Sequence, residues 1–215
     1  KNLLCISTDY LGDCQHKGKV LGVGMFRTGT TSLGDILNRL GYRSCSFTHG
    51  FMQTGNLKTW MDTSDRVVDD YINHWSENMR SGFRVMMNAT LSTNDGPWLF
   101  FYKQFDEWYP GSKFVLTVRN STRIHVNSEY SKGFRSNTTL KTILMQDPSK
   151  RPVVHRPFHK GLPVIDHMRL IARRYELHNA AVLEYFKGRE NDLLELCVEC
   201  DPEKALTDLK NFLGC

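Results

Sequence analysis

The fold is decided by a stretch near the N-terminus, residues 19–33, which reads KVLGVGMFRTGTTSL. Its first part, Lys19–Met25, is short, apolar and flanked by polar residues, which is typical of a buried strand. Apolar side chains then recur with helical spacing from about Thr31 to Leu40, and Gly41 stands where the C-cap of a helix is expected. The stretch therefore predicts a strand, a glycine-rich loop and a helix in direct succession.

The loop has the G-x-x-x-x-G spacing of a P-loop, with its glycines at Gly24 and Gly29. Such glycines let backbone N–H groups curl around an anion at a helix N-terminus, where unpaired donors and the helix dipole both favour negative charge. Nucleotide hydrolases place a lysine directly after the second glycine, whereas this chain has Thr30 there. The cation of the loop is Arg27 instead, which can neutralise charge that develops on a leaving oxygen. The loop thus predicts an anion site and disfavours Mg–ATP chemistry.

Strand and helix patterns alternate along the rest of the chain. Such alternation predicts a mainly parallel sheet with helices on both faces and ligands at the carboxyl ends of the strands. We expect one three-layer α/β/α domain over residues 1–215, with 1–18 as an N-terminal extension and 131–163 as an irregular insertion on the acceptor side. Beyond the first unit, strands are expected over Arg43–Phe47, Phe83–Asn88, Lys113–Arg119 and Leu193–Val198, and helices over Arg66–Met79, Pro97–Trp108, Ile165–Phe186 and Pro202–Leu213.

The composition is that of a folded protein and limits its ligands. Hydrophobic residues make up 40% and charged residues 24% of the chain, which excludes a disordered or fibrous protein. Lysine and arginine exceed aspartate and glutamate by 28 to 23, and the net charge of +5 suits a small anionic ligand. No basic run marks a nucleic-acid surface, and no apolar run approaches the length of a membrane span.

The six cysteines are too few for a disulfide scaffold. The close pair Cys197 and Cys200 has no second pair to complete a zinc site, so we expect two small residues at a strand end rather than a metal or redox site. Three N-x-S/T sequons begin at Asn88, Asn120 and Asn137, and such triplets also arise by chance.

The glycine loop also carries a family resemblance. The segment Lys19–Tyr42 resembles the 5′-phosphosulfate loop of sulfotransferases that use PAPS (3′-phosphoadenosine 5′-phosphosulfate), most of all the compact P-loop sulfotransferase family. The resemblance covers most of the chain and continues through Asp95–Pro97, Phe105–Arg119, Tyr175–His178 and Asn211–Gly214. It implies transfer of a sulfuryl group from PAPS to a hydroxyl or an amine, without a metal.

The resemblance further implies which residues bind the cofactor. Arg119, at the end of its strand, is similar to the arginine that binds the 3′-phosphate in the family. The family has a serine on the following helix where this chain has Asn127, and Ser128 comes one residue later. We expect Arg27 and Arg119 to grip opposite ends of one adenosine cofactor. The expected cofactor-binding residues are Arg27, Thr28, Gly29, Thr30, Thr31, Ser32, Arg119, Asn127 and Ser128.

Sulfuryl transfer also needs a base near the acceptor. In cytosolic sulfotransferases this base is a histidine in a His-x-Pro setting, and the resemblance puts Asp95 at that place. Asp95 alternatively caps the helix that Pro97 opens, because aspartate is a favoured N-cap. His49 is the competing base, or else an exposed loop histidine, and His178 is expected to be a hydrogen-bonded core histidine of the long helix. The expected catalytic residues are thus Arg27, Asp95 and His49.

The acceptor is expected to be a small molecule or a carbohydrate, no nucleic-acid partner is expected, and a homodimer is left open. We expect a cytoplasmic location, because a glycan on Asn120 would obstruct a nucleotide at Arg119. The Golgi lumen or another part of the secretory route is the alternative, given the sequons and the first residue, Lys1. Two other functions stay open: a phosphotransferase that uses ATP and Mg²⁺, and a diverged family member that binds another ligand without sulfating it.

Overall fold

The computed structural model describes residues 14–46, 91–94, 99, 101–135 and 164–215. Within these residues the centre is a five-stranded sheet in the order β2-β3-β1-β4-β5, and every pair of neighbouring strands is parallel. The expected α/β fold with a parallel sheet is thereby confirmed. The strands are β1 (Val20–Gly22), β2 (Ser44–Ser46), β3 (Ser92–Asn94), β4 (Lys113–Thr117) and β5 (Leu193–Leu196).

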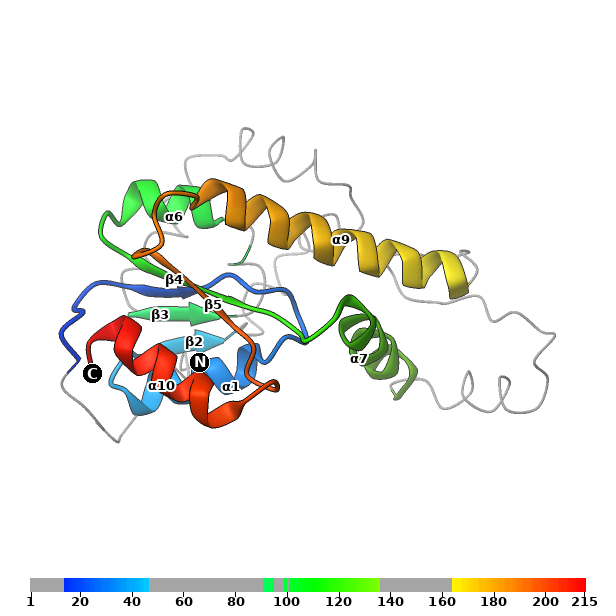
Figure 1. The fold of residues 1–215 in the computed structure, drawn as a ribbon, viewed down its shortest axis with the longest axis horizontal. Helices are drawn as coiled ribbons and strands as arrows, with labels where there is room; N and C mark the ends of the chain where they lie inside the picture. The colour runs from blue at the N-terminus through cyan, green and yellow to red at the C-terminus, as the bar shows by residue number, and fades with distance from the viewer. Residues whose placement is uncertain (1–13, 47–90, 95–98, 100, 136–163) are drawn as a thin grey trace, which may run out of the picture.

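Helices cover both faces of the sheet, as Figure 1 shows. α1 and α10 lie against one face and α6 and α9 against the other, while α7 packs against α9 beyond the ends of the strands. The expected three layers are therefore present. No helix in the described ranges is long and apolar enough to cross a membrane. The helices are α1 (Thr30–Arg39), α6 (Tyr102–Trp108), α7 (Thr122–Arg135), α9 (Val164–Tyr185) and α10 (Pro202–Leu213).

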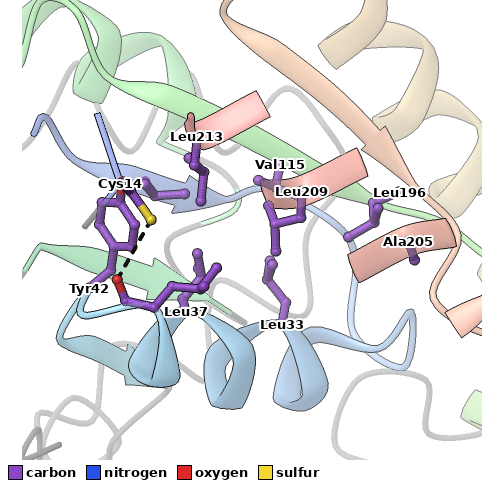
Figure 2. Packing of buried hydrophobic residues seen from close by; sticks show 11 residues of the cluster. Cys14, Leu33, Leu37, Tyr42, Val115, Leu196, Ala205, Leu209 and Leu213 are labelled. Atoms are coloured by element: carbon purple, nitrogen blue, oxygen red, sulfur yellow. Dashed lines mark hydrogen bonds between the residues drawn. The ribbon is translucent and has the colours of Figure 1, made fainter. Parts of the chain in front are cut away.

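The central strands supply two hydrophobic cores, one on each face. Successive side chains of a strand point to opposite faces. Val20 and Val115 therefore join the core under α1 and α10, which Figure 2 shows. Leu21, Phe114 and Leu116 join the core under α6 and α9. Burial of both faces explains why these strands read as continuous apolar runs.

The ends of α1 and α10 follow their local sequence signals. The Asp201 side chain accepts a hydrogen bond from the N–H of Lys204 at 3.0 Å, and Pro202 opens α10. Gly214 ends α10 with a φ of 67°, and Gly41 follows α1 with a φ of 89°. Both glycines have the left-handed conformation that a helix C-terminus favours, so both predicted helices are confirmed to within one residue at each end.

Other boundaries differ from the predictions. α6 begins at Tyr102 rather than at Pro97, and α7 continues to Arg135, into the segment expected to be irregular from residue 131. β3 was not predicted, because its three polar residues give no apolar run. The helix expected over 66–79 and the strand expected over 83–88 lie outside the described residues.

The end of the expected N-terminal extension is tied to the C-terminus. The N–H of Gln15 donates to the carbonyl oxygen of Gly214 at 2.9 Å, and the N–H of His16 to that of Leu213 at 3.0 Å. A disulfide joins Cys14 to Cys215, 201 positions apart in sequence. Residues 14–16 therefore close the domain against the end of α10.

Candidate functional site

The loop between β1 and α1 is held tightly against β4. A Cβ on Gly24 would lie 2.7 Å from the backbone nitrogen of Thr117 and still closer to its carbonyl and hydroxyl oxygens. The Thr28 hydroxyl donates to the carbonyl oxygen of Met25 at 2.6 Å and lies 2.6 Å from the Thr117 hydroxyl. The Thr28 side chain is buried, so its hydroxyl is engaged inside the loop. Close packing is thus the reason for glycine at position 24.

The N-terminus of α1 presents backbone donors, and no side chain in the described part of the chain caps them. Gly29 is the N-cap, with a φ of 96° in the left-handed region, and its helix has no acidic residue in the first turn. Thr31 and Ser32 are exposed there. The first N–H groups of a helix have no partner within it, and the helix dipole favours negative charge at this end. This end of α1 is therefore suited to binding an anion.

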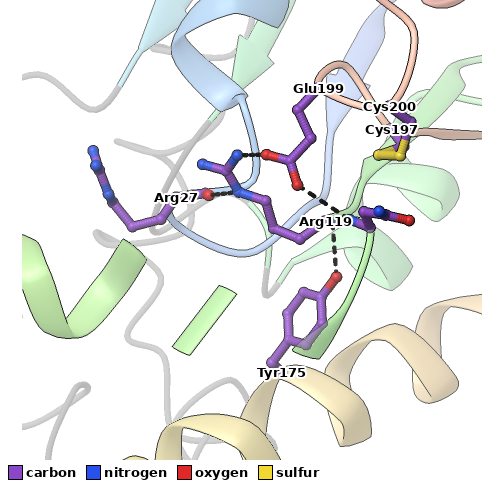
Figure 3. Close-up of a disulfide and its surroundings, with 7 residues drawn as sticks. Arg27, Arg119, Tyr175, Cys197, Glu199 and Cys200 are labelled. Carbon is purple, nitrogen blue, oxygen red and sulfur yellow. Dashed lines mark hydrogen bonds and ion pairs between the residues drawn. A yellow bond between two sulfur atoms is a disulfide. The ribbon is translucent and has the colours of Figure 1, made fainter. Parts of the chain in front are cut away.

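The second expected cation lies beside this loop. Arg119 comes just after β4, and its Nε donates to the carbonyl oxygen of Arg27, as Figure 3 shows. Its Nη2 lies 3.5 Å from the Ser128 hydroxyl on α7. The Arg27 side chain points away from the Arg119 guanidinium (Figure 3), and its buried Nε has no hydrogen-bond partner among the described residues. The two arginines are thus in contact at the carboxyl edge of the sheet.

Positive charge is crowded at this place. Burial, and then the charge of Arg27, lower the pKa of Arg119. A guanidinium nevertheless stays protonated in proteins. The charge of Arg27 is the second cause of this shift, so the two guanidinium groups repel each other, and a bound anion would reduce this repulsion.

A carboxylate already occupies part of the site. Glu199 forms an ion pair with Nη1 of Arg119, and its other oxygen accepts a hydrogen bond from the N–H of Asn120 at 3.1 Å (Figure 3). The side chains of Arg119 and Glu199 are 20% and 27% exposed. Glu199 was not among the expected site residues. The available signal was its place just after β5, because parallel neighbours such as β4 and β5 end at the same edge of a sheet.

Tyr175 of α9 forms a hydrogen bond with the backbone of Arg119, and His125 of α7 packs against Tyr175. The Tyr175 hydroxyl accepts a hydrogen bond from the N–H of Arg119 at 2.9 Å, and its ring stacks on His125 with centroids 4.1 Å apart. His125 is only 1% exposed. Its burial, and then the charge of Arg119, lower its pKa to about 4, so the imidazole is neutral at neutral pH.

His178 lies half-buried with Nε2 2.6 Å from the carbonyl oxygen of Val23, which agrees with the structural role expected for it.

Most of the expected cofactor-binding residues come together in this place. Asn127 does not: it is exposed on α7, and Ser128, one residue further round the helix, is the side chain next to Arg119. Asp95 and His49 lie outside the described residues, so the identity of the base stays a prediction. The residues that lie here come from the loop, the first turn of α1, the end of β4 and α7: Arg27, Thr28, Gly29, Thr30, Thr31, Ser32, Arg119 and Ser128.

The two cysteines that lie close in sequence are bonded to each other. Cys197 and Cys200 form a disulfide across the turn that follows β5, where the N–H of Cys200 donates to the carbonyl oxygen of Cys197 at 3.3 Å. This turn brings the two Cα atoms to 5.4 Å, the separation that a disulfide needs. The sequence predicted two small residues at a strand end and left their pairing open, because it does not reveal the shape of the turn. Glu199 lies inside this short disulfide ring.

Comparison with known proteins gives the family. A family model described as a sulfotransferase domain matches residues 19–215. One curated relative is Ava biosynthesis cluster protein M from Aspergillus versicolor, which is 31% identical over 102 residues. The match covers 47% of this chain and 38% of that protein, so it extends over well under half of the relative's length. With the family model spanning the glycine loop, the sheet and the C-terminal helix, this chain belongs to the sulfotransferase domain family.

Proposed function

We propose that this chain transfers a sulfuryl group from PAPS to a hydroxyl or an amine of a small-molecule or carbohydrate acceptor. Membership of the sulfotransferase domain family supports the class of reaction. The observation that carries the choice of donor is the contact between Arg119 and the carbonyl oxygen of Arg27, because it puts a second cation beside the uncapped N-terminus of α1. Two neighbouring anion sites suit a nucleotide with phosphate groups on two positions of its ribose.

The residues at both places fit such a nucleotide. The Arg119 guanidinium and the N–H of Asn120 hold a carboxylate, that of Glu199, and a phosphate uses the same kinds of donor. The first turn of α1 offers backbone N–H groups and carries no acidic residue of its own. Arg27 adds a buried Nε that has no partner in the described part of the chain.

Each residue then has a role in the proposal. PAPS, when bound, supplies a sulfuryl group activated on its 5′-phosphate. Arg27 and the first turn of α1 hold this end and stabilise negative charge on the leaving phosphate. Arg119 and Ser128 hold the 3′-phosphate. Asp95 or His49 takes the proton of the acceptor.

The location proposed differs from the one expected from the sequence. The two disulfides between described residues favour an oxidising compartment, because such bonds are rare in the cytosol. We therefore place the chain in the secretory route, with Asn120 unglycosylated beside its nucleotide.

The name of the curated relative refers to a biosynthesis cluster, which supports a small-molecule acceptor.

Calorimetric titration with adenosine 3′,5′-bisphosphate (PAP), the desulfated product, tests the choice of donor. The protein should bind PAP with a Kd below tens of micromolar when a chelator has removed divalent metals. ADP serves as the control nucleotide, because it lacks the 3′-phosphate. No binding of PAP at tens of micromolar, or tight binding of ATP that depends on Mg²⁺, would contradict the proposal and favour a phosphotransferase.

Two arginine variants test the residues assigned to the site. Arg27→Ala and Arg119→Ala should each weaken PAP binding about tenfold or more, because each removes charge-assisted hydrogen bonds worth roughly 1.5–3 kcal/mol. Lys210→Ala is the matched control, since it removes the same charge from an exposed position in the last turn of α10. An equal loss in all three variants would indicate a general effect of net charge instead of a built site.

A further inference from the structure

Glu199 stands where the proposed function requires a phosphate. One of its oxygens is paired with Nη1 of Arg119, and the other accepts from the N–H of Asn120. These two donors come from consecutive residues at the end of β4 and converge on one carboxylate (Figure 3). Convergence of a guanidinium and a backbone N–H on one acidic group is a common way to bind phosphate. The Glu199 carboxylate thus occupies the place at which a phosphate would bind.

The remaining faces of the Arg119 guanidinium are engaged elsewhere. Nε donates to the carbonyl oxygen of Arg27, and Nη2 faces the Ser128 hydroxyl. A phosphate can reach Ser128 from Nη2, but a second contact with the guanidinium needs the Nη1 that Glu199 holds. A bidentate phosphate and the Glu199 carboxylate therefore compete for the same donor.

The backbone keeps the carboxylate in place. Glu199 is the residue next to Cys200 in the ring closed by the Cys197–Cys200 disulfide, directly after β5. The hydrogen bond from Cys200 N–H to the Cys197 carbonyl oxygen closes the same turn. A short cross-linked turn restricts the backbone from which the side chain projects.

We propose that Glu199 is an autoinhibitory competitor that occupies the phosphate site at Arg119 until a nucleotide displaces it. The inference rests on the proposed function, in which Arg119 binds the 3′-phosphate. Because displacement requires breaking the ion pair, Glu199 weakens binding of a 3′-phosphorylated nucleotide. The opposite role, in which Glu199 holds Arg119 in a productive position, predicts the opposite sign for its removal.

The test compares wild type with Glu199→Gln by calorimetry, using PAP and 5′-AMP as ligands. Glu199→Gln should bind PAP about tenfold more tightly, a factor that corresponds to about 1.4 kcal/mol. It should change the Kd for 5′-AMP by less than about twofold, because 5′-AMP has no 3′-phosphate to displace the carboxylate. Glu195→Gln is the matched control, since it removes the same charge from an exposed position on β5 and should leave both affinities unchanged.

The outcomes separate the two ideas. Unchanged or weaker PAP binding by Glu199→Gln, or an equal gain for 5′-AMP, overturns the competitor role while the proposed function stands. PAP binding that improves as much in Glu195→Gln overturns it as well, because the gain then follows net charge. Failure of wild type and of every variant to bind PAP overturns the proposed function, and the competitor role with it.

Discussion

Replacing Gly24 with alanine should lower the free energy of unfolding by about 3 kcal/mol, near the upper end for an overpacked site. The new Cβ would lie 2.7 Å from the backbone nitrogen of Thr117 and closer still to its carbonyl oxygen. A change of rotamer cannot relieve contacts with backbone atoms, so β4 or the loop has to move. The hydrogen bond between the hydroxyls of Thr117 and Thr28, at 2.6 Å, is also disturbed, which adds about 1 kcal/mol at most.

Gly111→Ala provides the comparison that isolates this steric effect. Gly111 has a φ of 79°, and no atom of the described residues lies within 4 Å of the position that its Cβ would take. Alanine there meets only backbone strain, about 1 kcal/mol. Urea unfolding followed by tryptophan fluorescence gives both free energies of unfolding. A loss in Gly24→Ala no larger than that in Gly111→Ala would refute the packing argument for the glycine loop.

Two further predictions concern the disulfides and the buried histidine. Cys14→Ser combined with Cys215→Ser should lower the free energy of unfolding by about 5 kcal/mol, the loop-entropy value for a bond that joins residues 201 apart in sequence. Urea unfolding checks this, and a loss no larger than that of Cys197→Ser with Cys200→Ser, whose bond closes only a short turn, would contradict it. Wild type should lose up to about 3 kcal/mol relative to His125→Phe as the pH falls from 6.5 toward 4, because only the unfolded imidazole takes up a proton in that range. Urea unfolding across this pH range measures the difference, and parallel curves for the two proteins would disprove the role of His125.

Much of the fold could be predicted because its signals are local. The run that forms β4 is apolar on both faces, and the cap residues Asp201 and Gly214 mark α10 within the sequence itself. β3 lacked such a signal. Its Asn94 side chain is buried with a partner far away in sequence, because the amide donates to the carbonyl oxygen of Thr30 in α1. Only the assembled fold supplies this partner.

The part of the site that depends on local motifs could also be predicted from the sequence. The glycine loop and Arg119 follow from motifs and from strand ends. The contacts of Glu199 and the stack of His125 on Tyr175 do not, because they join α7, α9 and the turn after β5 to β4. Ser128, rather than Asn127, faces Arg119 because neighbouring residues of a helix point in different directions.

A crystal structure of the chain with PAP tests most directly whether the loop before α1 and Arg119 hold two ends of one nucleotide. The proposed function predicts the 5′-phosphate at the first turn of α1 near Arg27 and the 3′-phosphate on Arg119 and Ser128. The competitor role of Glu199 predicts that its carboxylate has moved aside. A nucleotide bound away from the loop would contradict the proposed function, and one that leaves the Arg119–Glu199 ion pair intact would contradict the competitor role.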